Sequence, residues 1–208
     1  MAITSVRTSS ITDPQRFQSL AQATYVAPIT PGMVLVSPAS IAYSGTSATL
    51  GANGQVTFTA VTSLSLNGVF SADFDNYVMS IRSNDSSGQV NILARLRASG
   101  VDADAANYTR QYLFVTSTSA APARQTSQTY LFVGGSDNEQ MSGDHVHIYG
   151  PALAQPTATR NVNITGQLGA YIQENACTHS LSTSYDGITL FGGVNSLTGA
   201  LTVYGVRS

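Results

Sequence analysis

The chain has no lysine and no tryptophan, a single cysteine, and very little charge of either sign. Its 208 residues include nine positive side chains, all of them arginine, and charged residues make up 10% of the sequence. Globular domains typically carry about a quarter. Solubility must therefore depend on Ser, Thr, Asn and Gln, which suit the outward faces and turns of β-strands. Such a composition is common in all-β proteins that work outside the cytoplasm or inside assemblies.

The sparse charge argues against a nucleic-acid partner. The formal net charge is −2, and the arginines are scattered from Arg7 to Arg207 without forming a basic stripe for phosphates. No apolar run approaches the ~18 residues of a membrane span, and the N-terminal residues lack the apolar core of a signal peptide. We expect no nucleic-acid partner, no membrane insertion, and synthesis in a cytoplasm without secretory export.

Motifs for catalysis are also scarce. The sequence has no G-x-S-x-G, no H-E-x-x-H and no phosphate-binding loop with Gly-Lys-Ser/Thr. Asp102 and Asp104 lie within residues 101–106, which we predict to be a loop with solvated carboxylates. Cys177 has no disulfide partner in the chain and is predicted to be a small buried apolar residue. We therefore expect no enzymatic activity and no cofactor.

Residues 1–30 differ from the rest of the chain. The dipeptide Asp13-Pro14 is a typical helix start, with a capping Asp and Pro at the first helical position. Phe17, Leu20 and Tyr25 then follow at helical spacing. A helix this short is marginal by itself, so it should pack on a partner. We predict a short N-terminal helix that serves as an attachment segment.

From residue 31 onward the hydrophobic period changes to two, as in β-strands. Val56, Phe58 and Ala60 alternate with polar residues, for example, after the turn residues Asn53-Gly54. Many short strands separated by turns predict an antiparallel β-sandwich of the jelly-roll type over residues 31–208. The last strand should pair with neighbours on both edges. The predicted strands cover 55–60, 77–82, 90–97, 112–116, 129–133, 146–149, 160–164, 188–191 and 201–206.

One strand carries two histidines. His145 and His147 have the same parity, so both imidazoles should leave the same face, close enough to share one metal ion. Two ligands are too few for a tight site, although three such pairs on the axis of a homotrimer would supply six nitrogens. The favoured alternative is pairing across strands or with neighbouring chains, including a pH-sensitive contact. Tyr112, Tyr130 and Tyr149 also fall within strands, where we predict core or interface positions.

Several motifs occur in an order that is similar to that of a known group of proteins. The chain contains Gly32, Val36-Ser37-Pro38, Ser65-Leu66-Asn67-Gly68-Val69-Phe70-Ser71, Asp75-Asn76-Tyr77, Tyr149-Gly150-Pro151, Tyr185-Asp186-Gly187 and Gly199-Ala200-Leu201. In order and spacing they resemble the short structural proteins of tailed-bacteriophage particles, of the minor tail protein, tail fibre and head fibre type. The resemblance spans about residues 31–208.

The resemblance implies an exposed homotrimeric jelly-roll-like domain on the phage particle, held to other virion proteins by residues 1–30. Its expected function is to bind a glycan or protein of the host cell surface, with many weak contacts adding up to avidity. Polar, Gly-rich loops are the predicted contact sites. They comprise Asn84, Asp85, Ser86, Ser87 and Gly88 in one loop and Gly134, Gly135, Ser136, Asp137 and Asn138 in another.

Two other functions stay open at this point. One is that the protein decorates or stabilises the capsid as a head fibre without binding a receptor, in which case its copy number per particle should be high. A polysaccharide depolymerase is disfavoured because glycosidases use paired carboxyl groups, and acidic residues are sparse here.

Overall fold

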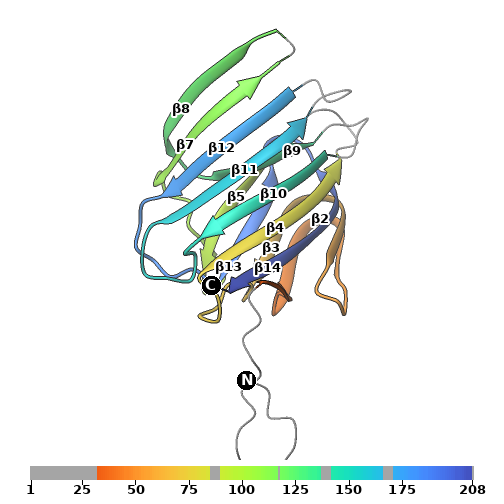
Figure 1. Cartoon of the computed structure of the whole chain (residues 1–208). Coiled ribbons are helices and arrows are strands. Elements are labelled where there is room, and N and C mark those ends of the chain that lie inside the picture. The colour runs from red at the N-terminus through yellow and green to blue at the C-terminus, as the bar shows by residue number, and fades with distance from the viewer. Residues whose placement is uncertain (1–31, 85–89, 117, 137–141, 166–170, 208) are drawn as a thin grey trace, which may run out of the picture. The chain divides into compact units, whose positions relative to one another are not determined.

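A computed structural model describes residues 32–84, 90–116, 118–136, 142–165 and 171–207 of the chain. Every regular element in these ranges is a β-strand, which confirms the all-β class (Figure 1). The strands are β1 (Gly32–Val36), β2 (Ser40–Leu50), β3 (Val56–Asn67), β4 (Asn76–Asn84), β5 (Val90–Ala98), β6 (Val101–Asp102), β7 (Tyr108–Val115), β8 (Ala120–Gln128), β9 (Leu131–Ser136), β10 (Ser142–Tyr149), β11 (Thr157–Thr165), β12 (Tyr171–His179), β13 (Gly187–Gly192) and β14 (Leu197–Arg207).

The predicted attachment segment is not among the described residues. Residues 1–30, with the expected helix and its residues Phe17, Leu20 and Tyr25, lie outside the described ranges. Within those ranges, no helix has the length and apolar character needed to span a membrane.

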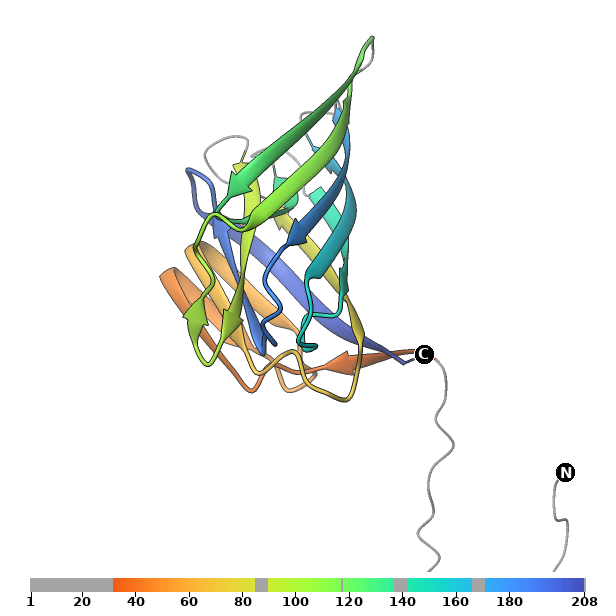
Figure 2. The ribbon, with the colours of Figure 1, turned by 90° about the vertical axis from the view of Figure 1, so that its left-hand side faces the viewer.

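The strands form one antiparallel sheet that curls back on itself (Figures 1 and 2). Its order is β6-β5-β13-β3-β14-β4-β10-β11-β12-β7-β8, with β1 beside β14, β2 beside β3 and β9 beside β5. Strand β9 pairs with β5 and also packs against β10, β11 and β12. The β5–β9 side of the sheet therefore covers the inner face of the β10–β12 side, and the core lies between them.

Strand β3 forms the corner of the curl. One of its edges pairs with β2, whereas the other pairs first with β14 and then with β13. The register of β2 shifts between Ser44 and Gly45, as at a β-bulge. A Cβ at Gly45 would lie 2.3 Å from the carbonyl oxygen of Ala60, and the φ of Gly45 is +120°. Only glycine allows the two backbones to approach so closely at the bend.

The predicted period of two is confirmed by the burial of the strands. Along β10, burial alternates at every residue from Ser142 to Tyr149. Large apolar side chains on the inner faces make the core, and burial of each contributes on the order of 1.5–3 kcal/mol. They include Val56, Phe58, Leu64, Leu66, Met79, Ile81, Ile92, Leu96, Ile188, Leu190, Leu201 and Val203.

The predicted strand 201–206 lies within β14, which is paired along both edges. Strand β4 runs along one edge, and β3 and then β1 run along the other. The backbone N–H and C=O groups of β14 therefore find partners within the sheet, as expected. Cys177 is 2% exposed, which confirms its predicted burial.

Candidate ligand-binding cleft

A cleft of about 1040 Å³ opens between the β7–β8 hairpin and β5. Its floor consists of side chains that share one face of β12, β7 and β8, because residues in register on neighbouring strands stand side by side. In the register of these strands, Gln173 stands beside Phe114 and Ala121, Tyr112 stands beside Ala123, and Arg110 stands beside Gln125. The two alanines of β8 leave open space beside the aromatic rings of β7.

The opposite side of the cleft comes from three separate parts of the chain. Asn91 and Leu93 belong to β5, Tyr130 directly precedes β9, and Gly193 and Val194 lie between β13 and β14. Val194 is 83% exposed, so the rim is open to solvent. The far end of the β7–β8 hairpin extends beyond the ends of the neighbouring strands (Figure 2).

Arg110 lies at the base of the cleft and is 8% exposed. Its Cζ atom is 3.7 Å from the ring centroid of Phe132 and 4.1 Å from that of Tyr112. Its Nε and Nη2 donate to Oδ1 of Asn175 at 2.9 and 2.7 Å, and its Nη1 donates to Oε1 of Gln125 at 3.5 Å. Burial lowers the pKa of Arg110, yet a guanidinium stays protonated in proteins. The cleft therefore contains a fixed positive charge.

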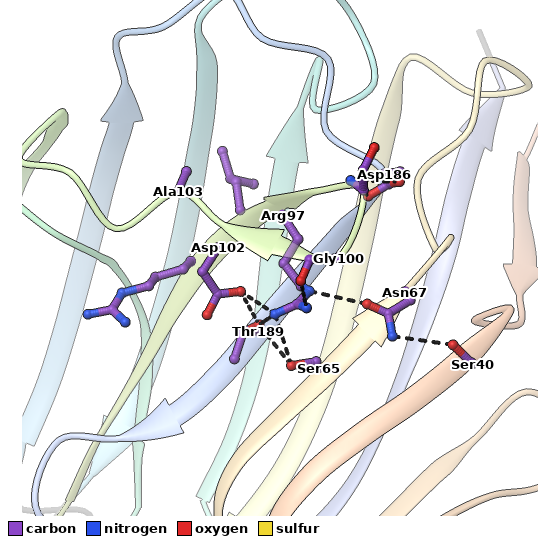
Figure 3. A network of polar contacts seen from close by, with 12 residues as sticks. Ser40, Ser65, Asn67, Arg97, Gly100, Asp102, Ala103, Asp186 and Thr189 are labelled. Atoms are coloured by element: carbon purple, nitrogen blue, oxygen red, sulfur yellow. Dashed lines mark hydrogen bonds and ion pairs between the residues drawn. The ribbon is translucent and has the colours of Figure 1, made fainter.

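A second arginine, Arg97, lies in a network of polar contacts in which a carboxylate neutralises its charge (Figure 3). Its Nη1 forms an ion pair with Asp102 and donates to Oγ1 of Thr189 at 2.7 Å and to Oγ of Ser65 at 3.2 Å. Its Nε donates to Oδ1 of Asn67 at 3.2 Å. This network ties β5 and β6 to β3 and β13. We interpret it as a structural cross-link, because each group has its partner within the network.

The ion pair of Asp102 corrects a prediction. Residues 101–106 were expected to be a loop with solvated carboxylates, but Val101 and Asp102 form β6, which pairs with the end of β5. The solvated state is therefore wrong for Asp102, because Arg97 reaches it across the sheet. A sequence pattern cannot show a partner that only strand pairing brings near.

In the described part of the chain, Arg110 has no such carboxylate. Among the described residues, the ion pairs are Arg97 with Asp102 and Arg160 with Glu174. The partners of Arg110 are the side-chain amides of Asn175 and Gln125, which carry no charge. Among the described residues, its positive charge is therefore not balanced by a carboxylate.

The first predicted recognition loop lies mostly outside the described residues. Asn84 is the last residue of β4 and is half-buried. Asp85, Ser86, Ser87 and Gly88 are not described, so their predicted role stays a prediction.

The second predicted loop is wrong over its first three residues. Gly134, Gly135 and Ser136 belong to β9, where they pair with β5, and both glycines are buried. Asp137 and Asn138 lie outside the described ranges. Gly134 passes so close to Asp144 that a Cβ would lie 2.2 Å from Oδ2 of that residue. Gly134 therefore permits close packing rather than a turn.

His145 and His147 do share one face, as predicted. Both are exposed on the outer side of β10, where a hollow of about 270 Å³ also involves Tyr149, Arg160 and Val162. The ring of His147 stacks on that of Tyr149, with 6.3 Å between centroids. Within the described part of the chain, no group of three or more His, Cys, Asp or Glu side chains could hold a metal ion. A metal site here would need ligands beyond the described residues of one chain, for example from further copies of the chain.

Sequence reasoning missed the cleft. It placed Tyr112 and Tyr130 in the core or an interface, and it gave Arg110 no role. One local signal was present in the sequence. Arg110, Tyr112 and Phe114 occupy every second position of β7, so a cation and two aromatic rings lie on the same face of the strand. The remaining lining residues come from other strands and have no local signature.

Comparison with known proteins adds no relative: no protein-family model matches this chain, and no curated protein matches it.

Proposed function

We propose that this chain is a structural protein of a bacteriophage particle that binds a saccharide of the host cell surface through the cleft around Arg110. In this proposal residues 31–208 form an exposed jelly-roll-like domain, and residues 1–30 attach it to other virion proteins. The ordered motifs of residues 31–208, the low charge content and the antiparallel β-fold support the phage assignment.

The observation that carries the binding function is the lining of the cleft. Tyr112, Phe114 and Tyr130 line the cleft with aromatic rings, and the apolar C–H face of a sugar can stack on such rings. Gln125 and Gln173 offer amides, which both donate and accept hydrogen bonds and so suit hydroxyl groups. Apolar walls with a few placed polar groups are typical of ligand sites.

We infer binding without hydrolysis. The described lining of the cleft contains neither Asp nor Glu, whereas most glycosidases use two carboxyl groups on either side of the scissile bond. A single shallow site of this kind binds weakly. Several copies per particle would convert weak contacts into avidity, because each further contact becomes intramolecular.

The outer face of the sheet supports a homotrimer. Val162, Leu113 and Ile172 are 49%, 40% and 48% exposed there, on the neighbouring strands β11, β7 and β12. The ion pair of Arg160 with Glu174 lies on the same face, so the surface carries both signs and can complement a second copy of itself. In this proposal the chain presents its cleft to the host and its outer face to its sister chains.

Binding of the labelled full chain to purified bacterial surface polysaccharides tests the function. Gln125→Ala removes an amide from the cleft, and Gln111→Ala is the matched control because Gln111 points from the opposite face of β7. The proposal expects loss of binding by the first variant alone. Equal binding by both variants would contradict the assignment of the cleft.

Capsid decoration is separated from host binding by counting copies in purified particles. Hundreds of copies per particle, together with no binding to any cell-surface polysaccharide, would favour the decoration role over the proposed one.

A further inference from the structure

The positive charge in the cleft favours ligands that carry a negative charge. Among the described residues that line it, Arg110 is the only one with a charged side chain. A buried charge is costly unless it is paired, and the hydrogen-bond partners of Arg110 among the described residues are neutral amides. An anionic group on a ligand would supply the missing partner.

The guanidinium is also held ready for such a group. The rings of Phe132 and Tyr112 both contact it, and Asn175 accepts from Nε and Nη2 through a single oxygen atom. On the Nη1 side, Gln125 is 3.5 Å away, a distance at which a hydrogen bond is weak. The Arg110 side chain therefore loses little conformational freedom when a ligand binds. The Nη1 side of its guanidinium makes only a weak hydrogen bond and can donate to a ligand.

We propose that the cleft selects an acidic saccharide, and that Arg110 binds its carboxylate while Tyr112, Phe114 and Tyr130 contact the sugar rings. This inference rests on the proposed function and specifies the ligand of the same site. A carboxylate is favoured because a planar guanidinium donates to its two oxygens in parallel. The uncharged amides of Gln125 and Gln173 then remain available for the hydroxyl groups.

The test uses two saccharides that differ only at the acid. Trigalacturonate and its carboxyl-reduced form, galactotriose, are titrated separately into the full chain by isothermal calorimetry at low salt. The inference expects trigalacturonate to bind about ten-fold or more tightly, as a charge-assisted hydrogen bond predicts. Galactose 6-phosphate, compared with galacturonate, separates a phosphate from a carboxylate as the preferred anion.

Two variants link the preference to the cleft. Arg110→Lys keeps the charge but removes the fork, and it should reduce trigalacturonate binding with little effect on galactotriose. Because Arg110 is buried and its replacement can disturb folding, a second pair is placed at the exposed rim. Val194→Glu adds a negative charge there, and Val194→Gln has nearly the same shape without the charge. The first should weaken trigalacturonate binding about five-fold at low salt and much less at 1 M salt.

The outcomes distinguish this inference from the function on which it rests. Equal affinity for the two trisaccharides, with both weakened by Gln125→Ala, would overturn the acidic preference and leave saccharide binding intact. Binding of neither would overturn both. Equal effects of Val194→Glu and Val194→Gln would contradict binding of the acid group in the cleft, and tighter binding of galactose 6-phosphate than of galacturonate would overturn the carboxylate assignment.

Discussion

Asp144 should make the stability of this protein depend on pH in an unusual direction. The residue lies on the inner face of β10 and is 1% exposed. Neither carboxylate oxygen has a hydrogen bond of good geometry in the described structure. Burial raises the pKa of Asp144 from 3.8 to about 8, and the nearby backbone amide of Gly135 offsets only part of this rise. The side chains that face it include Ile81 from β4 and Asn163 from β11, neither of which is charged.

The sign and size follow from proton linkage. Between about pH 4 and pH 8 the folded protein holds a proton on Asp144 that the unfolded chain has released. Stability therefore falls as pH rises through this window, by up to about 1.4 kcal/mol per pH unit. At a pH below the pKa of Asp144 in the unfolded chain, the residue does not reduce the stability. At a pH above its pKa in the folded protein, the full reduction is present. At pH 7 the cost is on the order of 4 kcal/mol.

The assay is urea unfolding of the full chain and of Asp144→Asn between about pH 5 and pH 8. The variant keeps the size of the side chain but cannot ionise, so the difference between the two proteins isolates Asp144, and the histidines cancel. We expect the variant to gain stability over the wild type steadily as pH rises. Asp104→Asn, at an exposed position, is the control and should show no such gain. A constant difference across the range would refute a buried carboxyl with a raised pKa.

Three other changes should have defined effects. Gly134→Ala should destabilise the fold by about 2 kcal/mol, because the new Cβ lies 2.2 Å from Oδ2 of Asp144; in denaturation experiments the loss should shrink when Asp144 is shortened to Ala, and purely additive losses would contradict the clash. Val162→Glu should shift the sedimenting species from trimer to monomer, whereas Val101→Glu, at an equally apolar exposed position on β6, should not; a trimer in both would exclude the outer face. Arg97→Gln should lower the free energy of unfolding by about 1–3 kcal/mol because it strands the polar groups of its network, and an unchanged urea midpoint would show that the network is dispensable.

The polarity of the buried side chains decides which strands could be predicted from the sequence. In β10, Val146 and Ile148 face inward and His145 and His147 face outward, so alternation of polarity reveals the strand. In β12 the relation is reversed, because Gln173 is buried and Ile172 is exposed. A pattern of hydrophobicity cannot identify a strand whose inner face is polar.

Two other strands were missed for different reasons. Strand β8 contains Pro122 and few large apolar residues, which fits its place at the end of the sheet, where one edge needs no partner. In β2, exposed and half-buried residues replace the clean alternation, and the register shift at Gly45 interrupts it further. Both strands depend on pairing with a stronger neighbour, which local sequence does not record.

The cleft could not be predicted from the sequence for the same reason. Arg110, Gln173 and Val194 lie on β7, on β12 and in the connection between β13 and β14, so only the curl of the sheet brings them to one cleft. The sequence did contain the alternation of Arg110 with Tyr112 and Phe114. The sequence alone could not show that no described carboxylate pairs with Arg110, because this depends on every strand that packs nearby.

The most direct test of the saccharide cleft is a nuclear magnetic resonance titration of the full chain with acidic oligosaccharide. The side-chain amide signals of Asn91, Gln125 and Gln173 report on the cleft, and those of the backbone at His147 and Val162 report on the outer face. The account predicts saturable shifts at the three amides and none on the outer face. Shifts confined to His147 and Val162, or no shifts at all, would contradict it.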